Sequence, residues 1–234
     1  METSLHRQLK ARYCVVEADR EVWVGDFRVD AVVEGRLIEV QQASLAALRT
    51  KIRTLVETHD VLVVKPLAAS TRIVRYESAG GPVAWARKSP TKRGWWHLFD
   101  DLVHFVRVFP HPRLTLEVVL LDQEEHRIPA PKRRQRSKDY RTQDRLVLEV
   151  RDVKTFRTAG DLLALLPIEL PSPFSTAELA KLAHIPRWLA QKAAYCLRHT
   201  GAITAAGKRG HACLYTWERP RLKPVRKRTP RKAA

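Results

Sequence analysis

The sequence has few cysteines, and their positions do not suit a disulfide framework or a zinc cluster. Cys14, Cys196 and Cys213 are widely spaced in 234 residues and odd in number. No apolar run approaches the roughly 18 residues that a membrane-spanning helix needs. Acidic residues within the first thirty positions do not fit a secretory signal peptide. We therefore expect a cytoplasmic protein with no membrane partner.

Acidic residues are scarce as well, since 25 Asp and Glu stand against 43 Lys and Arg, for a net charge of +18. Segment 131–141 has six Lys or Arg against Asp139, and the tail 219–234 has eight and no acid. Together these segments supply thirteen of the eighteen charges. Two basic segments on a body of modest charge favour DNA as partner and association with the nucleoid. The alternative is a solubilising tail or nonspecific adhesion.

Several common enzyme signatures are missing. The sequence has no glycine-rich phosphate loop, and no Ser/His/Asp or Cys/His constellation stands out. The histidines at 59, 97, 104 and 111 lack a convincing acidic partner at helical ligand spacing. We therefore expect no small-molecule cofactor.

The apolar periodicity predicts an α/β protein with a mixed sheet flanked by helices. Helices are expected over 3–13, 44–59 and 95–106, and strands over 21–33, 36–41, 61–65, 72–76, 114–121 and 146–153. Glu34-Gly35 is the turn of a hairpin between the first two strands. This first domain is predicted to span 1–156, with a core at 1–78 and a basic loop at 129–142.

A second domain is indicated after Phe156. Three prolines in LPIELPSPF mark a linker at 157–173. Ser175 and Glu178 form a capping box that opens one helix, and a second helix over 187–200 stops at Gly201. Two short strands at 202–204 and 212–217, on either side of 205–210, complete a winged helix-turn-helix at 174–218, followed by a disordered basic tail at 219–234.

In this winged helix, Leu189, Ala193 and Leu197 should face inward. The side chains left for a DNA groove are Arg187, Gln191, Lys192, Tyr195 and Arg198, with Lys208 and Arg209 on the wing. The basic loop adds Lys132, Arg133, Arg134 and Arg136. Protein docking is the alternative use of such a module.

An acidic pair lies on the predicted hairpin. Counting outward from the turn places Asp30 directly opposite Glu39. Facing like charges destabilise a sheet, and a divalent cation would stabilise the pair because Mg²⁺ binds carboxylates, waters and phosphate oxygens. Alternatively Arg28, which faces Gln41, neutralises the two carboxylates without a metal.

The order of a helix, Asp30, Glu39-Val40-Gln41, a helix and a buried strand resembles the PD-(D/E)XK nuclease superfamily, whose fold is restriction-endonuclease-like. The resemblance covers about residues 2–76. It implies that Asp30 and Glu39 bind Mg²⁺ or Mn²⁺, and that Glu2 matches an acidic residue that some members place on the first helix. The whole chain is also similar to uncharacterised bacterial proteins that join such a core to a C-terminal winged helix.

Gln41 departs from the family's motif, in which a lysine stands at this position. Glutamine has no charge, although it can align a water molecule. Some relatives place the lysine on the following helix, where Lys51 shares a face with Leu48 and Leu55. Alternatively, Lys51 reaches past that apolar stripe into water.

Segment 86–96, ARKSPTKRGWW, mixes four cations with two tryptophans. Such a mixture suits phosphates and unpaired bases, whereas the alternative is that Trp96 packs in the core. The sequence as a whole favours a metal-dependent DNA phosphodiester hydrolase that a winged helix delivers to DNA. The alternatives are a catalytically inactive DNA-binding regulatory or architectural protein and a protein-docking module. A homodimer is possible in each case.

Overall fold

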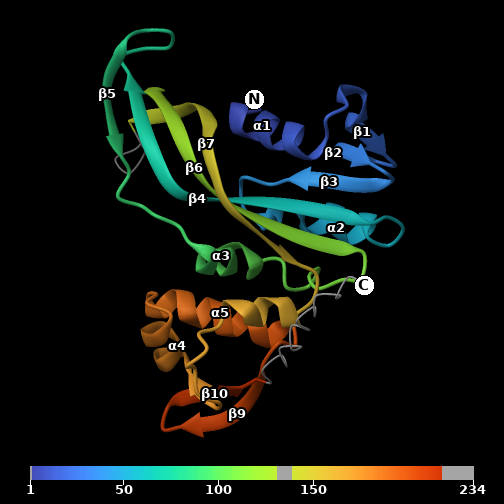
Figure 1. The fold of residues 1–234 in the computed structure, drawn as a ribbon, viewed down its shortest axis with the longest axis vertical. Coiled ribbons are helices and arrows are strands. Elements are labelled where there is room, and N and C mark those ends of the chain that lie inside the picture. Colours follow the sequence, from blue (N-terminus) through green and yellow to red (C-terminus); the bar gives the residue numbers. More distant parts are fainter. Residues whose placement is uncertain (1, 131–138, 218–234) are drawn as a thin grey trace, which may run out of the picture.

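The structure is a computed structural model that describes residues 2–130 and 139–217. It is a mixed α/β protein with a large mixed sheet flanked by helices (Figure 1). The helices are α1 (Ser4–Tyr13), α2 (Arg49–Leu55), α3 (Leu98–Leu102), α4 (Thr176–Leu182) and α5 (Arg187–His199). The strands are β1 (Arg20–Val24), β2 (Phe27–Val33), β3 (Arg36–Val40), β4 (Val61–Tyr76), β5 (Val83–Lys88), β6 (Leu114–Pro129), β7 (Tyr140–Phe156), β8 (Phe174–Ser175), β9 (Thr204–Arg209) and β10 (Ala212–Thr216). The predicted tail at 219–234, and Lys132, Arg133, Arg134 and Arg136 of the basic loop, lie outside the described residues.

The large sheet has the order β1-β2-β3-β4-β6-β7, and β5 pairs with the far half of β4. Strands β3, β4 and β6 run parallel, whereas the other neighbours are antiparallel. The predicted hairpin register is confirmed, because Val33 pairs with Arg36 across a turn in which both Glu34 and Gly35 have positive φ. The single strand expected over 21–33 is wrong, because a turn at Gly25 divides it into β1 and β2.

The two strands expected over 61–65 and 72–76 are one continuous strand, β4. Pro66 does not interrupt it, although proline has no N–H for a sheet ladder. Along this edge of β4 the pairing with β3 ends at Val64, and the pairing with β5 begins only at Arg72. Pro66 therefore lies where this edge has no strand neighbour among the described residues, while β6 continues along the other edge.

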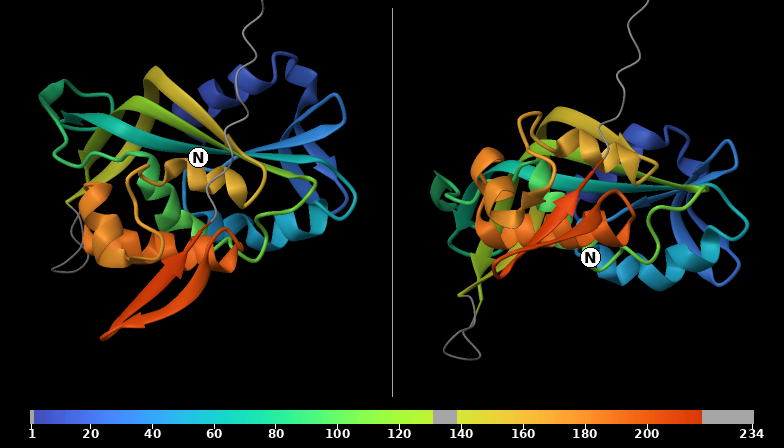
Figure 2. Two further views of the ribbon diagram at one scale, coloured as in Figure 1. Left: turned by 60° about the horizontal axis from the view of Figure 1, so that its bottom comes forward. Right: turned by 90° about the horizontal axis from the view of Figure 1, so that it is seen from below.

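Helices cover both faces of the sheet (Figure 2). Leu5 and Leu9 of α1 pack on one face in a cluster with Ile38 and Val40. The predicted inner stripe of the second helix is confirmed, since Leu45, Leu48, Ile52 and Leu55 are buried against the other face. The helix there is shorter than expected and begins as a 3-10 turn at Leu45–Leu48. No helix within the described ranges is long and apolar enough to cross a membrane.

The C-terminal part packs against α3. Cys196 and Leu197 of α5 are buried in the same cluster as Phe99 and Leu102 of α3. The segment expected to be a linker has buried side chains of its own, Leu162, Leu163, Leu166 and Leu170. The core is therefore continuous from the sheet through α3 to α5, and the domain boundaries stay predictions.

Helix α4 begins with the predicted capping box. The Ser175 hydroxyl accepts a hydrogen bond from the Glu178 N–H at 3.3 Å, and Glu178 Oε2 accepts one from the Ser175 N–H at 2.7 Å. The Ser175 N–H, the Ser175 hydroxyl, which also donates to Glu178 Oε2 at 2.8 Å, and Arg209 lower the pKa of the Glu178 carboxyl to about 2. Gly201, with φ of +80°, follows α5 as expected. The strand expected at 202–204 is misplaced, because β9 covers 204–209, most of the segment expected to be the connection, and the turn follows at Gly210.

Ser175→Ala should lower the free energy of unfolding by about 1 kcal/mol, because it removes the acceptor for an N–H of the first turn. Chemical denaturation of the full chain would measure this loss. Ser78→Ala, in the exposed turn after β4, is the matched control and should change stability by less than about 0.5 kcal/mol. Equal effects of both substitutions would contradict the capping role.

Candidate active site

Asp30 on β2 and Glu39 on β3 lie together where the ladder between these strands ends. The last pair of that ladder is Ala31 with Ile38, so Asp30 and Glu39 are the next residues in register. Asp30 Oδ2 accepts a hydrogen bond from the Val40 N–H at 2.7 Å. A side-chain bond therefore replaces the ladder at this point. The residue Glu39 is buried, at 4 % exposure.

Lys51 of α2 joins the pair from the neighbouring helix. Its Nζ donates to Glu39 Oε1 and to the Arg28 carbonyl oxygen. Its side chain is mostly buried, so it does not extend into water as the alternative expectation had it. Arg28 does not neutralise the carboxylates, because its Nε turns to Glu21 Oε2 at 3.0 Å on the outer strand.

Helix α1 adds a polar stripe that the sequence reading missed. His6 Nε2 lies 3.0 Å from Asp30 Oδ1, and the buried Lys10 contacts Glu21 and, at 2.6 Å, Glu2. Glu2 precedes the helix and is exposed, and its carboxylate lies 3.7 Å from His6 Nε2. His6 thus lies between the carboxylates of Glu2 and Asp30. The spacing of four between Glu2, His6 and Lys10 was a sequence signal for this stripe.

Gln41 holds the chain between β3 and α2. Its Nε2 donates to the Ser44 carbonyl oxygen at 2.8 Å, and its N–H donates to Val64 O at 2.9 Å. The amide is therefore bonded to the loop that leads to Lys51. The role of aligning a water molecule stays a prediction.

The two carboxylates differ in proton affinity. Burial alone would raise the pKa of Asp30, but the His6 bond and the Val40 N–H hold it below its usual value. Burial raises the pKa of Glu39 to about 7, since the Lys51 bond opposes it only in part and the Asp30 charge adds to it. Near neutral pH, Asp30 is therefore ionised, while Glu39 is protonated in part of the molecules.

The raised pKa of Glu39 predicts a pH-dependent stability. Between about pH 4.5 and pH 7 the folded protein holds a proton on Glu39 that the unfolded chain has lost. The free energy of unfolding therefore falls as pH rises through this window. Metal-free wild type should lose up to about 1.4 kcal/mol per pH unit in this window relative to Glu39→Gln. Urea titrations at several pH values would measure the difference. Parallel profiles for both proteins would contradict the raised pKa.

The site offers a divalent cation two carboxylates. Within 2–130 and 139–217, no group of three or more His, Cys, Asp or Glu side chains is arranged to hold a metal ion. Mg²⁺ is commonly held by only one or two carboxylates, with waters and substrate phosphates completing its coordination. Asp30 and Glu39 fit that donor set, and a cation would offset the repulsion between their charges.

The residues predicted to bind DNA from α5 are mostly exposed. Leu189, Ala193 and Leu197 are buried as expected, which leaves Arg187, Gln191, Tyr195 and Arg198 on the surface. Lys192 differs, because its Nζ binds Asp100 Oδ1 of α3 at 2.6 Å and lies over the Trp188 ring. Trp188, missed by the sequence reading, is 45 % exposed.

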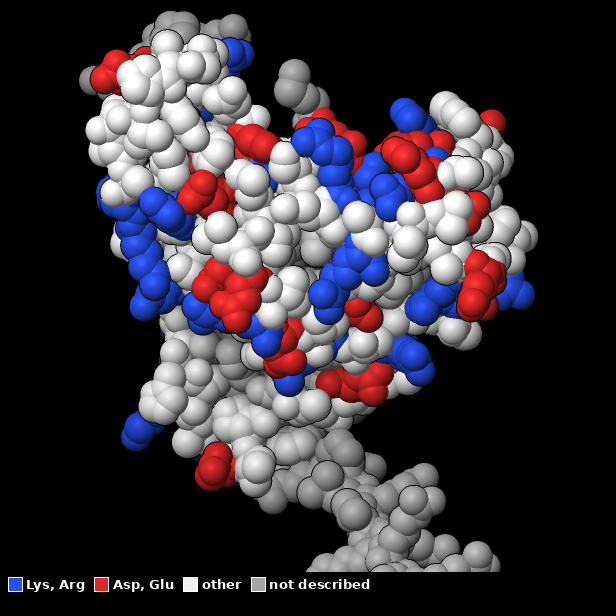
Figure 3. Space-filling model, turned by 45° about the horizontal axis from the view of Figure 1, so that its top comes forward, with Lys and Arg blue, Asp and Glu red and all other residues white. Residues whose placement is uncertain are grey.

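At the hairpin of the C-terminal part, Lys208 and Arg209 are exposed at the end of β9, and Arg209 binds Glu178 at 3.0 Å. Around the large sheet, the face shown in Figure 3 is hollowed between the β4–β5 arm and the β1–β2 end. Basic and acidic side chains mix across that face. The described residues of this face therefore present no continuous basic surface.

Comparisons with known proteins place the chain in a family. An uncharacterised protein of Treponema pallidum (strain Nichols) is 31 % identical over 220 residues, which cover 94 % of this chain and 86 % of the relative. No solved structure matches significantly. Residues 3–157 match the family described as "Domain of unknown function (DUF8091)". The chain therefore belongs to the DUF8091 family.

Proposed function

We propose that this protein is a metal-dependent DNA phosphodiester hydrolase. The observation that carries the proposal is the contact of Lys51 with Glu39, beside Asp30. Two carboxylates with one lysine are the charged groups of the PD-(D/E)XK motif that the sequence resembles, and a metal held by carboxylates can promote phosphodiester hydrolysis. Here the lysine comes from α2, while Gln41 occupies its usual place in the strand.

The topology also supports the proposal. Helix α1 is followed by the antiparallel strands β1, β2 and β3, then by α2 and by β4 parallel to β3. The PD-(D/E)XK superfamily, which the sequence resembles, has this order of a helix, a hairpin with the acidic motif, a crossover helix and a further strand.

The residues have separable roles in this proposal. Asp30 and Glu39 would hold Mg²⁺ or Mn²⁺, which when bound acts as a Lewis acid and lowers the pKa of a bound water. Lys51 brings a positive charge to the place where the phosphate gains negative charge. His6 fixes one oxygen of Asp30, and Gln41 fixes the loop before α2.

We propose further that the C-terminal part delivers the site to DNA as a winged helix. Helices α4 and α5 and the β9–β10 hairpin occur in the order that such a module requires. Exposed Arg187, Gln191, Tyr195 and Arg198 would face the DNA groove. The basic tail, expected to be disordered, would bind the DNA backbone, in keeping with a nucleoid location.

A cleavage assay tests the proposed function. Supercoiled, linear and branched DNA would be incubated with the full chain and Mg²⁺ or Mn²⁺, with EDTA as the metal-free control. Wild type should cut at least one substrate only when metal is present. Lys51→Ala should slow cutting by at least about tenfold, whereas Arg53→Ala, an exposed cation on the same helix, should not. Equal rates for the two variants would remove Lys51 from the mechanism.

The second candidate is a DNA-binding protein on an inactive nuclease-type fold. It is favoured by Gln41, which lacks the charge of lysine and is bonded to Ser44 O. DNA binding without cleavage of any substrate, unchanged by substitution of Asp30 and Glu39, would establish this candidate in place of the hydrolase.

A further inference from the structure

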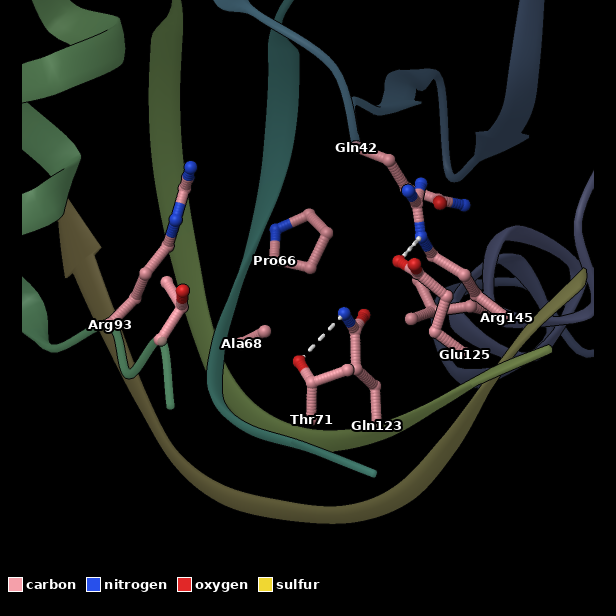
Figure 4. A pocket seen from close by; sticks show the side chains of 10 residues that line it. Gln42, Pro66, Ala68, Thr71, Arg93, Gln123, Glu125 and Arg145 are labelled. Atoms are coloured by element: carbon pink, nitrogen blue, oxygen red, sulfur yellow. Dashed lines mark hydrogen bonds and ion pairs between the residues drawn. The ribbon is translucent and has the colours of Figure 1, made fainter. Parts of the chain in front are cut away.

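A polar cavity lies beside the candidate site, along the stretch of β4 whose one edge has no strand neighbour in the described part of the chain. Its volume is about 250 Å³, and Pro66 and Ala68 of this free edge form part of its wall (Figure 4). The segment that follows β5 returns to this edge, where the Arg93 N–H donates a hydrogen bond to Ala68 O at 3.1 Å. The cavity forms because, along this edge of β4, the pairing with β3 ends before the pairing with β5 begins.

The cavity and the candidate site share two structural elements. Gln42, which lines the cavity, directly follows Gln41 at the end of β3. On α1, Leu5 lines the cavity while the next residue, His6, contacts Asp30. A strand of nucleic acid whose phosphate lay at Asp30 and Glu39 would therefore have the cavity close to a neighbouring nucleotide.

Arg93 provides the cavity with an available positive charge. In the described part of the chain its side chain makes no hydrogen bond or ion pair, and it extends along one wall in Figure 4. Arg145, on the opposite side, binds Glu125 Oε2 at 3.0 Å, and Arg127 binds the other oxygen at 2.6 Å. Since two arginines neutralise Glu125, the cavity retains a net attraction for a phosphate.

The remaining lining suits a nucleobase. Leu5, Pro66 and Ala68 give an apolar surface, and the Gln123 amide points into the cavity in Figure 4. Gln123 Nε2 donates to Thr71 Oγ1 at 3.1 Å, which orients its carbonyl oxygen as an acceptor. A base that leaves its stack is held in such a way, by apolar contact and by hydrogen bonds to its edge.

We infer that this cavity binds one unpaired nucleotide of a nucleic-acid strand, with Arg93 on its phosphate and Gln123 on the edge of its base. The inference rests on the proposed function for its substrate, and it narrows that substrate to DNA with an unpaired nucleotide next to the cleaved bond. A fully paired blunt duplex does not use the cavity.

Binding in the absence of metal tests this inference apart from catalysis. Fluorescence anisotropy would measure the affinity of the full chain for labelled ten-residue oligothymidylate and for a blunt ten-base-pair duplex, in EDTA and at about 0.3 M salt to weaken backbone-only contacts. Arg93→Ala and Gln123→Leu would be compared with Arg107→Ala, which removes an exposed cation outside the cavity. Thermal denaturation would check that each variant is folded.

Arg93→Ala should weaken oligothymidylate binding by about tenfold and Gln123→Leu by about fivefold, with no larger loss for duplex than Arg107→Ala shows. Equal effects of all three variants on oligothymidylate would overturn the inference. So would free thymidine monophosphate binding as tightly as the oligonucleotide, which would assign the cavity to a free nucleotide. A protein that never cuts DNA but shows the Arg93 effect would refute the hydrolase and keep the cavity.

Discussion

Asp30→Asn should lower the rate of metal-dependent DNA cleavage by at least about 10³-fold. Asn has the size of Asp but lacks its charge, so it weakens metal binding and the several kcal/mol of charge stabilisation that a metal supplies. The fold should persist, because the Asn carbonyl oxygen can still accept the Val40 N–H. The Asn amide group would then take the place of the Asp30 oxygen that His6 contacts. Rates under single-turnover conditions would measure the loss.

Glu124→Gln is the matched control for this substitution. It also neutralises a carboxylate of the large sheet, one that binds His126 and Arg72 away from Glu39 and Lys51. Its cleavage rate should stay within about twofold of wild type, because it changes none of the charges at the site. A similar loss of rate in both variants would place the effect of Asp30→Asn in the stability of the sheet.

Lys65→Ala should lower the free energy of unfolding by about 3–5 kcal/mol. Lys65 is 2 % exposed, and its Nζ donates to Ala43 O at 2.6 Å and lies 3.1 Å from Asp101 Oδ2. Removing the lysine leaves the Asp101 carboxylate, which is itself only 7 % exposed, without its partner. The same burial lowers the pKa of Lys65. Chemical denaturation would measure the loss.

Lys181→Ala, an exposed lysine of α4, is the control for that substitution and should cost less than about 0.5 kcal/mol. The double variant Lys65→Met with Asp101→Leu removes both charges and should recover most of the lost stability. A double variant as unstable as Lys65→Ala would show that the ion pair is not the cause.

The local parts of the fold could be predicted from the sequence. Glu34-Gly35 determined the hairpin register, and Ser175 with Glu178 determined the start of α4, because both signals involve residues close in the chain. β4 could not be predicted as one strand, since Pro66 is tolerated only because β3 ends before it. The missed strand β5 is exposed along its whole length, so no burial pattern marked it.

In the candidate site, too, the features that depend on local structure could be predicted, and those that depend on packing could not. The facing of Asp30 and Glu39 follows from strand register, and the face of Lys51 from helical periodicity, while the place of Lys51 at the site came from the resemblance to the PD-(D/E)XK superfamily. The contact of His6 with Asp30 depends on how α1 packs on the sheet. Lys192, in turn, was assigned to DNA from helical periodicity alone, and the packing of α5 on α3 directs it to Asp100.

Electron paramagnetic resonance of Mn²⁺ would test most directly whether Asp30 and Glu39 together hold a divalent cation. Free Mn²⁺ would be measured as the metal is titrated into wild type, into Glu124→Gln and into the double variant Asp30→Asn with Glu39→Gln. We predict one bound Mn²⁺ in wild type and in Glu124→Gln, tighter at pH 8 than at pH 6 because Glu39 must lose its proton, and none at that site in the double variant. Equal Mn²⁺ binding by all three proteins, or by none of them, would contradict the account.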